Sequence, residues 1–84
     1  MTVIKSDMSR LRWRCRRGTK ELDIVMNRYL AERYPTASVD EQASFNALLD
    51  VEDPIIFDML LDKTTSDDPD QQALIEILKG IMAT

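Results

Sequence analysis

Six consecutive residues combine the charges and the backbone freedom that a polar binding site needs: Arg16, Arg17, Gly18, Thr19, Lys20 and Glu21. Glycine adopts left-handed backbone conformations that strain other residues, and it lets another backbone approach closely. If the segment before Gly18 is helical, Gly18 suits a helix-ending position. Arg17 and Glu21 need not pair across such a break, so both would face a partner. The alternative is a glutamate that only stabilises the start of its own helix.

Upstream of this motif, a tryptophan stands among arginines at helical spacing. On a helix, one continuous face would carry Arg10, Trp13, Arg14 and Arg17, opposite an apolar stripe of Met8, Leu11 and Cys15. Tryptophan and arginine are enriched at the energetic centres of protein interfaces. We therefore predict a partner-binding surface, while a solvated cationic face and a tryptophan packed on a neighbouring helix remain alternatives.

Cys15 lies among cations that would lower the pKa of its thiol, so a reactive thiolate is conceivable. Its alignment with Met8 and Leu11 favours a small buried core residue instead. As the only cysteine it cannot form an internal disulfide, and we expect a reducing, cytoplasmic setting.

Other catalytic chemistry finds little support. The chain contains no histidine, the commonest general base and metal ligand. Two groups of carboxylates occur, but neither has calcium-loop spacing and both precede expected helices, where acids act as caps; they are Asp50, Glu52 and Asp53, and Asp67, Asp68 and Asp70. No glycine-rich phosphate loop is present. We predict no catalytic residue, no metal site and no enzyme activity.

Charge divides the chain unevenly. Residues 1–20 carry seven basic residues against one acid, a net +6, whereas residues 21–84 carry fourteen acids against four basic residues, a net −10. With 44% hydrophobic and 31% charged residues in 84, the chain should fold as one domain, residues 1–84. No apolar run is long enough to span a membrane. A short cationic edge on an acidic domain favours protein docking over general polyanion binding.

Apolar periodicity predicts an all-α protein, a compact five-helix bundle. The first helix is expected at residues 8–17, capped by Ser6 or Asp7 and stopped by Gly18, and the second from about Thr19 to before Pro35. Three further starts are a capping box at Ser38 and Glu41, Asp53-Pro54, and Asp68-Pro69. The inward faces we expect are Leu22, Val25, Met26, Tyr29 and Leu30; Phe45, Leu48 and Leu49; Ile56, Phe57, Leu60 and Leu61; and Leu74, Ile77, Leu78, Ile81 and Met82.

The run Cys15-Arg16-Arg17-Gly18-Thr19-Lys20-Glu21-Leu22-Asp23, followed by a short helical acidic domain, resembles the succinate dehydrogenase assembly factor family, also called flavinators. The R-G-x-x-E core is supported by Arg10 and Trp13 upstream and by the Leu-Leu and Asp-Pro pairs downstream. The resemblance covers nearly the whole chain.

This resemblance implies a five-helix domain that binds the flavoprotein subunit of succinate dehydrogenase, and in bacteria of fumarate reductase. The family promotes covalent attachment of FAD to a histidine of that subunit, so the FAD belongs to the partner and the chain alone would bind no cofactor. By position, the motif residues are Arg17, Gly18 and Glu21, and Arg10 supports the same surface. Docking would hold flavin and histidine in reactive geometry.

A different class of function uses the same face. The arginines of the first helix would contact phosphates and Trp13 would stack on a base, making a small nucleic-acid-binding protein. The net negative charge of the domain argues against this reading.

Overall fold

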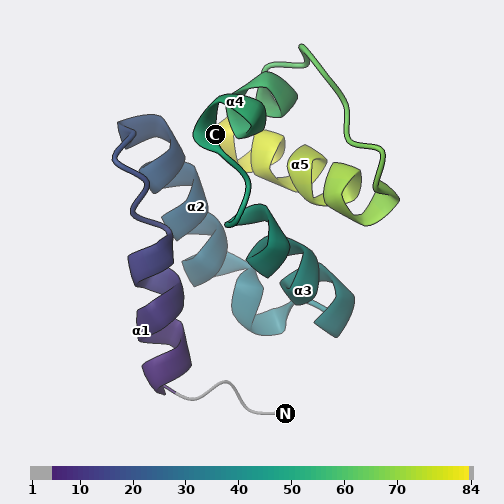
Figure 1. Cartoon of the computed structure of the whole chain (residues 1–84). Coiled ribbons are helices and arrows are strands. Elements are labelled where there is room, and N and C mark those ends of the chain that lie inside the picture. Colours follow the sequence, from purple (N-terminus) through teal and green to yellow (C-terminus); the bar gives the residue numbers. More distant parts are fainter. Residues whose placement is uncertain (1–4, 84) are drawn as a thin grey trace.

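The computed structural model describes the backbone of residues 5–83 and the side chains of residues 9–83. Within this range the chain forms helices and no strands (Figure 1): α1 Lys5–Arg14, α2 Lys20–Glu32, the 3₁₀ turn η1 Tyr34–Thr36, α3 Val39–Leu48, α4 Asp53–Leu60 and α5 Pro69–Met82. The predicted all-α, five-helix architecture is confirmed. None of the described helices has the length and apolar character needed to cross a membrane.

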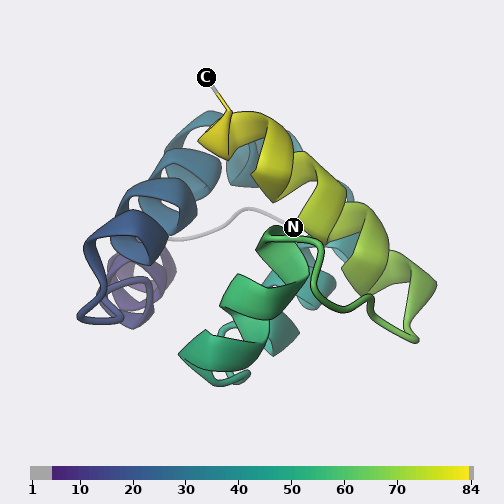
Figure 2. The same ribbon diagram turned by 90° about the horizontal axis from the view of Figure 1, so that it is seen from above.

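The last helix organises the packing. α5 contacts α2, α3 and α4, while α1 packs against α2. Viewed from above, the C-terminal ends of α2 and α5 converge (Figure 2), and there Arg28 Nη1 donates a hydrogen bond to the Ile81 carbonyl at 3.0 Å. The R-G-x-x-E motif lies at the other, N-terminal end of α2.

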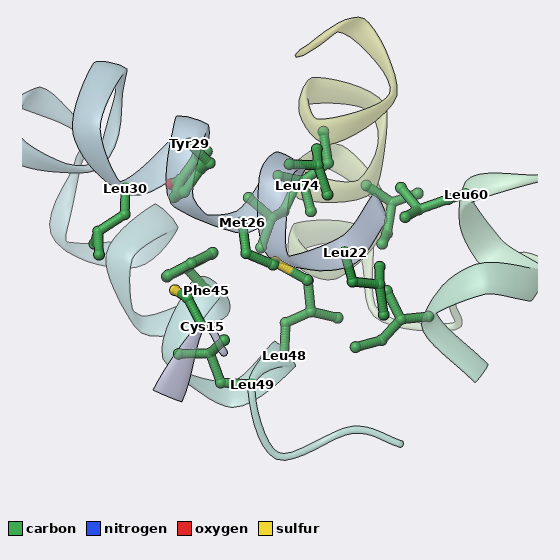
Figure 3. Close-up of a cluster of buried hydrophobic side chains, with 14 of the residues drawn as sticks. Cys15, Leu22, Met26, Tyr29, Leu30, Phe45, Leu48, Leu49, Leu60 and Leu74 are labelled. Atoms are coloured by element: carbon green, nitrogen blue, oxygen red, sulfur yellow. The ribbon is translucent and has the colours of Figure 1, made fainter. Parts of the chain in front are cut away.

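The core is centred on α2 and completed by α3, α4 and α5. The residues predicted to face inward on α2 and α3 are all buried (Figure 3): Leu22, Val25, Met26, Tyr29 and Leu30, with Phe45, Leu48 and Leu49. The Tyr29 and Phe45 rings lie 4.5 Å apart between centroids, and Tyr34 packs against both. Burial of each large apolar side chain stabilises the fold by about 1.5–3 kcal/mol, so this cluster stabilises the position of α2, the helix that follows residues 15–19.

α1 begins and ends earlier than the sequence predicts. It covers Lys5–Arg14, so Ser6 and Asp7 lie inside it and are not caps. It ends with a tightened turn in which the Arg16 amide donates to the Trp13 carbonyl, well before Gly18. Leu11 and Cys15 are buried as predicted, whereas the Met8 side chain lies outside the described residues.

The three predicted starts of α3, α4 and α5 are confirmed, but only two of the three predicted caps are. The Glu41 amide donates to Ser38 Oγ at 3.1 Å, and the Asp70 amide donates to Asp68 Oδ1 at 3.0 Å. Asp53, however, does not cap α4: the N-cap is Glu52, without a side-chain bond. Asp53 instead lies in the first turn of α4 and pairs with an arginine described below.

The capping box is only half formed. The Glu41 carboxylate does not reach back to Ser38; it accepts hydrogen bonds from Tyr29 Oη at 2.7 Å and Arg33 Nε at 2.9 Å. Glu41 therefore connects α3 to α2 and to Arg33, the residue that follows α2.

The inward faces of α4 and α5 agree with the prediction only in part: Ile56, Leu60, Leu74 and Leu78 are buried, whereas Phe57, Ile77 and Ile81 are partly buried. Leu61 and Met82, expected inside, are 54% and 42% exposed, and Met59 and Ile75 are buried instead. α4 ends at Leu60 and the chain turns through Asp62, which has a φ of 62°. The fully buried stripe of α5 is Leu74, Ile75 and Leu78, which is rotated toward Ile75 relative to the predicted face.

Candidate partner-binding surface

The connection between α1 and α2, residues 15–19, is here called the motif loop. It runs along an outer edge of the molecule (Figure 1). Gly18 is exposed and has a φ of +82°, so its predicted left-handed conformation is confirmed, although not at a helix end. A Cβ added to Gly18 would meet no atom within 4 Å. The glycine is therefore required by its backbone conformation, and the space beside it is open to a partner.

Arg17 is placed differently from the predicted helix face. Its side chain is only 12% exposed and points toward the connection between α3 and α4, residues 49–53, here called the α3–α4 corner. Nε donates to Asp53 Oδ1 at 2.7 Å, Nη1 donates to the Leu49 carbonyl, and Nη2 donates to the Val51 carbonyl. The expectation that Arg17 shares an outward face with Arg10 and Trp13 is wrong, because the chain leaves the helix at Cys15.

Two further hydrogen bonds hold the motif loop. The Arg17 amide donates to Asp23 Oδ1 at 2.5 Å, and Thr19 Oγ1 lies 3.5 Å from Asp53 Oδ2. The loop is thus fastened on one side to the first turns of α2 and on the other to the α3–α4 corner.

Glu21 lies in the first turn of α2 and is exposed. It forms no hydrogen bond or ion pair with the residues that the structure describes, and Arg17 pairs with Asp53 instead, so the prediction that the two need not pair is confirmed. A carboxylate at a helix N-terminus is favoured by the helix dipole. Its exposure also leaves it available to a donor on another protein.

The rest of the predicted face is exposed on α1. Trp13 is 70% exposed and points away from the core, as predicted, and Arg10 is exposed beside it. Arg14 Nη2 donates to Asp50 Oδ1 at 2.7 Å and to the Asn46 carbonyl at 3.4 Å. Arg14 and Arg17 therefore both pair with acids of the α3–α4 corner, which makes these two cations less available to the phosphates of a nucleic acid.

Sequence reasoning missed a groove beside Trp13. This groove, of about 470 Å³, is lined by Ser9, Arg12, Trp13, Arg16 and Asn27. The Arg16 guanidinium carbon lies 5.7 Å from the centre of the Trp13 ring, within the range of a cation–π contact. Arg12 and Arg16 are four residues apart, and this helical spacing could have predicted that both lie on the same side of the first helix. The groove offers an aromatic ring and two cations to a partner.

Cys15 is fully buried in the core, as the preferred reading predicts. Burial raises the pKa of its thiol to about 11, and the nearby Arg17 and Arg14 only partly offset this effect. A thiol with this pKa is overwhelmingly protonated at neutral pH, so the arrangement does not favour a nucleophilic cysteine. Among the described residues, no three acidic, cysteine or histidine side chains are grouped so as to hold a metal ion.

Comparison with known proteins identifies the family. A family model described as "Flavinator of succinate dehydrogenase" matches residues 9–82. A protein of Coxiella burnetii named FAD assembly factor SdhE is 38% identical over 72 residues, covering 86% of this chain and 88% of that protein. Proteins with the same name from Pseudomonas putida and Xylella fastidiosa are 33% and 36% identical, covering 90% and 93% of this chain and 90% and 80% of their own lengths. These matches confirm the resemblance seen in the residues around Gly18, and the chain belongs to the family of succinate dehydrogenase flavinators.

Proposed function

We propose that this chain binds the flavoprotein subunit of succinate dehydrogenase and promotes covalent attachment of FAD to that subunit. The observation that carries the proposal is the exposure of Gly18 in the motif loop, of Glu21 in the first turn of α2 and of Trp13 on α1, in a member of the flavinator family. The chain contributes a docking surface and leaves the chemistry to its partner.

Each part of this surface has a physical role in docking. Gly18 lets a partner backbone come close, because it carries no Cβ and its surroundings are open. Glu21 accepts hydrogen bonds from partner donors. Trp13 and Arg10 extend the contact along α1, where aromatic and arginine side chains provide large interface energies.

The acceleration would come from orientation. FAD and its acceptor histidine belong to the flavoprotein, and this chain contains no histidine. By binding one conformation of the flavoprotein more tightly than others, the surface shifts its population toward the arrangement in which flavin and histidine meet. In bacteria the same surface would serve fumarate reductase, and a reducing cytoplasm, where Cys15 stays a thiol, is the setting we infer.

The test uses the two glycines of the chain. The flavoprotein subunit is coexpressed with wild type, Gly18→Arg or Gly80→Arg in a host that lacks its own assembly factor, and covalent flavin is measured by fluorescence in denaturing gels. Gly80 is exposed on α5, outside the proposed surface, and also has open space around it, so Gly80→Arg controls for the added side chain, while the melting temperature of Gly18→Arg controls for the strain at its φ of +82°.

We expect Gly18→Arg to cut labelling at least about tenfold, since a clash at a close approach that costs about 1.4 kcal/mol weakens binding by that factor. Gly80→Arg should label like wild type. If Gly18→Arg labels the flavoprotein as well as wild type does, docking through the motif is wrong. If wild type itself adds no label, the assembly role is wrong.

A further inference from the structure

We infer that Asp53, outside the R-G-x-x-E motif, is a positioning residue that sets the shape of the motif loop through Arg17. This inference rests on the proposed function. According to this inference, Arg17 does not contact the partner. Its guanidinium holds the motif loop against the α3–α4 corner, while Gly18 and Glu21 contact the partner.

The Arg17 side chain fastens the motif loop to the α3–α4 corner through several hydrogen bonds. Its guanidinium reaches three acceptors on one short segment: the Asp53 carboxylate and the carbonyls of Leu49 and Val51. The Arg17 and Asp53 side chains are only 12% and 27% exposed, so water competes weakly for these bonds. A planar guanidinium serves several fixed acceptors at once, which a lysine ammonium cannot do with the same geometry.

The Arg17 side chain also provides a hydrogen-bond donor to the C-terminal end of α3. α3 ends at Leu48 with Leu49 as its C-cap, and carbonyls at a helix C-terminus lack partners within the helix. Arg17 donates to the Leu49 carbonyl and brings a positive charge to the negative end of the helix dipole. The corner and the loop therefore stabilise each other.

The loop is held on both sides of Gly18. On one side, the Arg17 amide is bound to Asp23 and its side chain to the corner; on the other, the Thr19 hydroxyl faces the second oxygen of Asp53. Gly18, at a φ of +82°, lies between these anchors. Loss of the Asp53 carboxylate would remove one anchor from each neighbour of Gly18 at once, although the carboxylate itself is not needed to touch the partner.

Two variants at Asp53 test this. Asp53→Asn keeps the size of the side chain and removes its charge, and Asp53→Glu keeps the charge. Asp62→Asn is the matched control, because Asp62 forms an ion pair with Lys79 beyond the other end of α4, and asparagine tolerates its φ of 62°. The full-length variants are titrated into purified flavoprotein subunit with FAD. The readouts are covalent flavin, amide hydrogen exchange of residues 16–20 and of α5, and the melting temperature.

For Asp53→Asn we expect the concentration for half-maximal labelling to rise about tenfold, the scale of a lost charge-assisted hydrogen bond. Exchange should accelerate in residues 16–20 and not in α5, at temperatures where the variant is folded. Asp53→Glu should recover much of the labelling, and Asp62→Asn should label like wild type. A purely structural role would make labelling follow the melting temperature in all variants, which would overturn the inference.

Arg17→Lys separates positioning from direct contact and covers the case that Asp53→Asn folds poorly. If Arg17 acts through Asp53, Arg17→Lys weakens labelling to a similar degree and the double variant is little worse than either single variant, because one interaction is lost in all three. If Arg17→Lys abolishes labelling while Asp53→Asn leaves it unchanged, Arg17 touches the partner directly and the inference is wrong. Wild-type labelling in the same titration tests the proposed function independently.

Discussion

At the scale of single residues, Gly18 has two separate reasons to be glycine. Its φ of +82° is costly for residues with a Cβ, and its open surroundings allow a partner to approach. The two reasons can be separated because asparagine tolerates left-handed backbone better than alanine but is larger.

Gly18→Ala should destabilise the fold by about 1–2 kcal/mol through backbone strain, and Gly18→Asn by less. Chemical denaturation of both variants measures the strain, and the flavinylation assay measures docking. We expect Gly18→Asn to lose more labelling than Gly18→Ala despite its higher stability. The opposite order would mean that strain alone explains the glycine.

Cys15 gives a second test at this scale. Its thiol is buried and its pKa is raised to about 11, mainly by burial, so alkylation at about pH 7.5 requires the chain to open. In the native protein, iodoacetamide should react with Cys15 at least about a hundredfold more slowly than in denaturant, as followed by intact mass. Equal alkylation rates in the native and denatured protein would support an accessible, reactive Cys15 thiol.

At the scale of elements, polar side chains join each helix to the next. Ser38 caps α3, and Glu41 in the first turn of α3 binds Tyr29 of α2 and Arg33 just after it. Arg17 does the equivalent for the motif loop and the α3–α4 corner. These polar contacts add to the apolar core in holding the elements together.

Ser38→Ala should lower the free energy of unfolding by about 1 kcal/mol, the usual contribution of an N-cap. For a domain of this size, this corresponds to a fall in melting temperature of about 4–8 °C. Ser44→Ala, inside α3 and away from the cap, is the control and should change the melting temperature little. A Ser38→Ala variant that melts with the control would show that the cap contributes nothing.

At the scale of the whole molecule, stability should depend on pH through the Tyr29, Arg33 and Glu41 cluster. Hydrogen bonds from Arg33, and secondarily from Tyr29, lower the pKa of Glu41 against the opposing effect of burial. A carboxylate whose pKa is lower in the folded state stabilises the fold above its unfolded pKa, and this contribution is lost as pH falls through the folded value. Burial and Glu41 raise the pKa of Tyr29, so the Tyr29 contribution is lost at strongly alkaline pH.

Glu41→Gln isolates the acidic part of this dependence. At about pH 7 wild type should be the more stable protein, and the difference between the two should shrink as pH falls below about 4.5, the ordinary value for a glutamate. Denaturant titrations at several pH values measure this difference. A difference that stays constant from neutral to strongly acidic pH would mean that Glu41 does not titrate against these partners.

Local signals in the chain account for most of the helices and for the family. The caps Ser38 and Asp68, the buried stripe from Leu22 to Leu30 and the motif around Gly18 are all readable within a few residues, because helix periodicity, capping and backbone conformation depend on near neighbours. The outward position of Trp13 follows from the same local spacing.

Arg17 shows where local signals end. Its acceptors lie more than thirty residues away, and nothing near Arg17 in the chain distinguishes a docking arginine from one that binds the end of another helix. Leu61, expected inside, lies beyond the end of α4 at Leu60 and is exposed, whereas Met59, within the helix, is buried. Residue types and near-neighbour spacing thus defined the helices and the exposed glycine, whereas contacts across the fold turned the arginine of the motif inward, because unpaired helix-end carbonyls and a carboxylate were there to bind it.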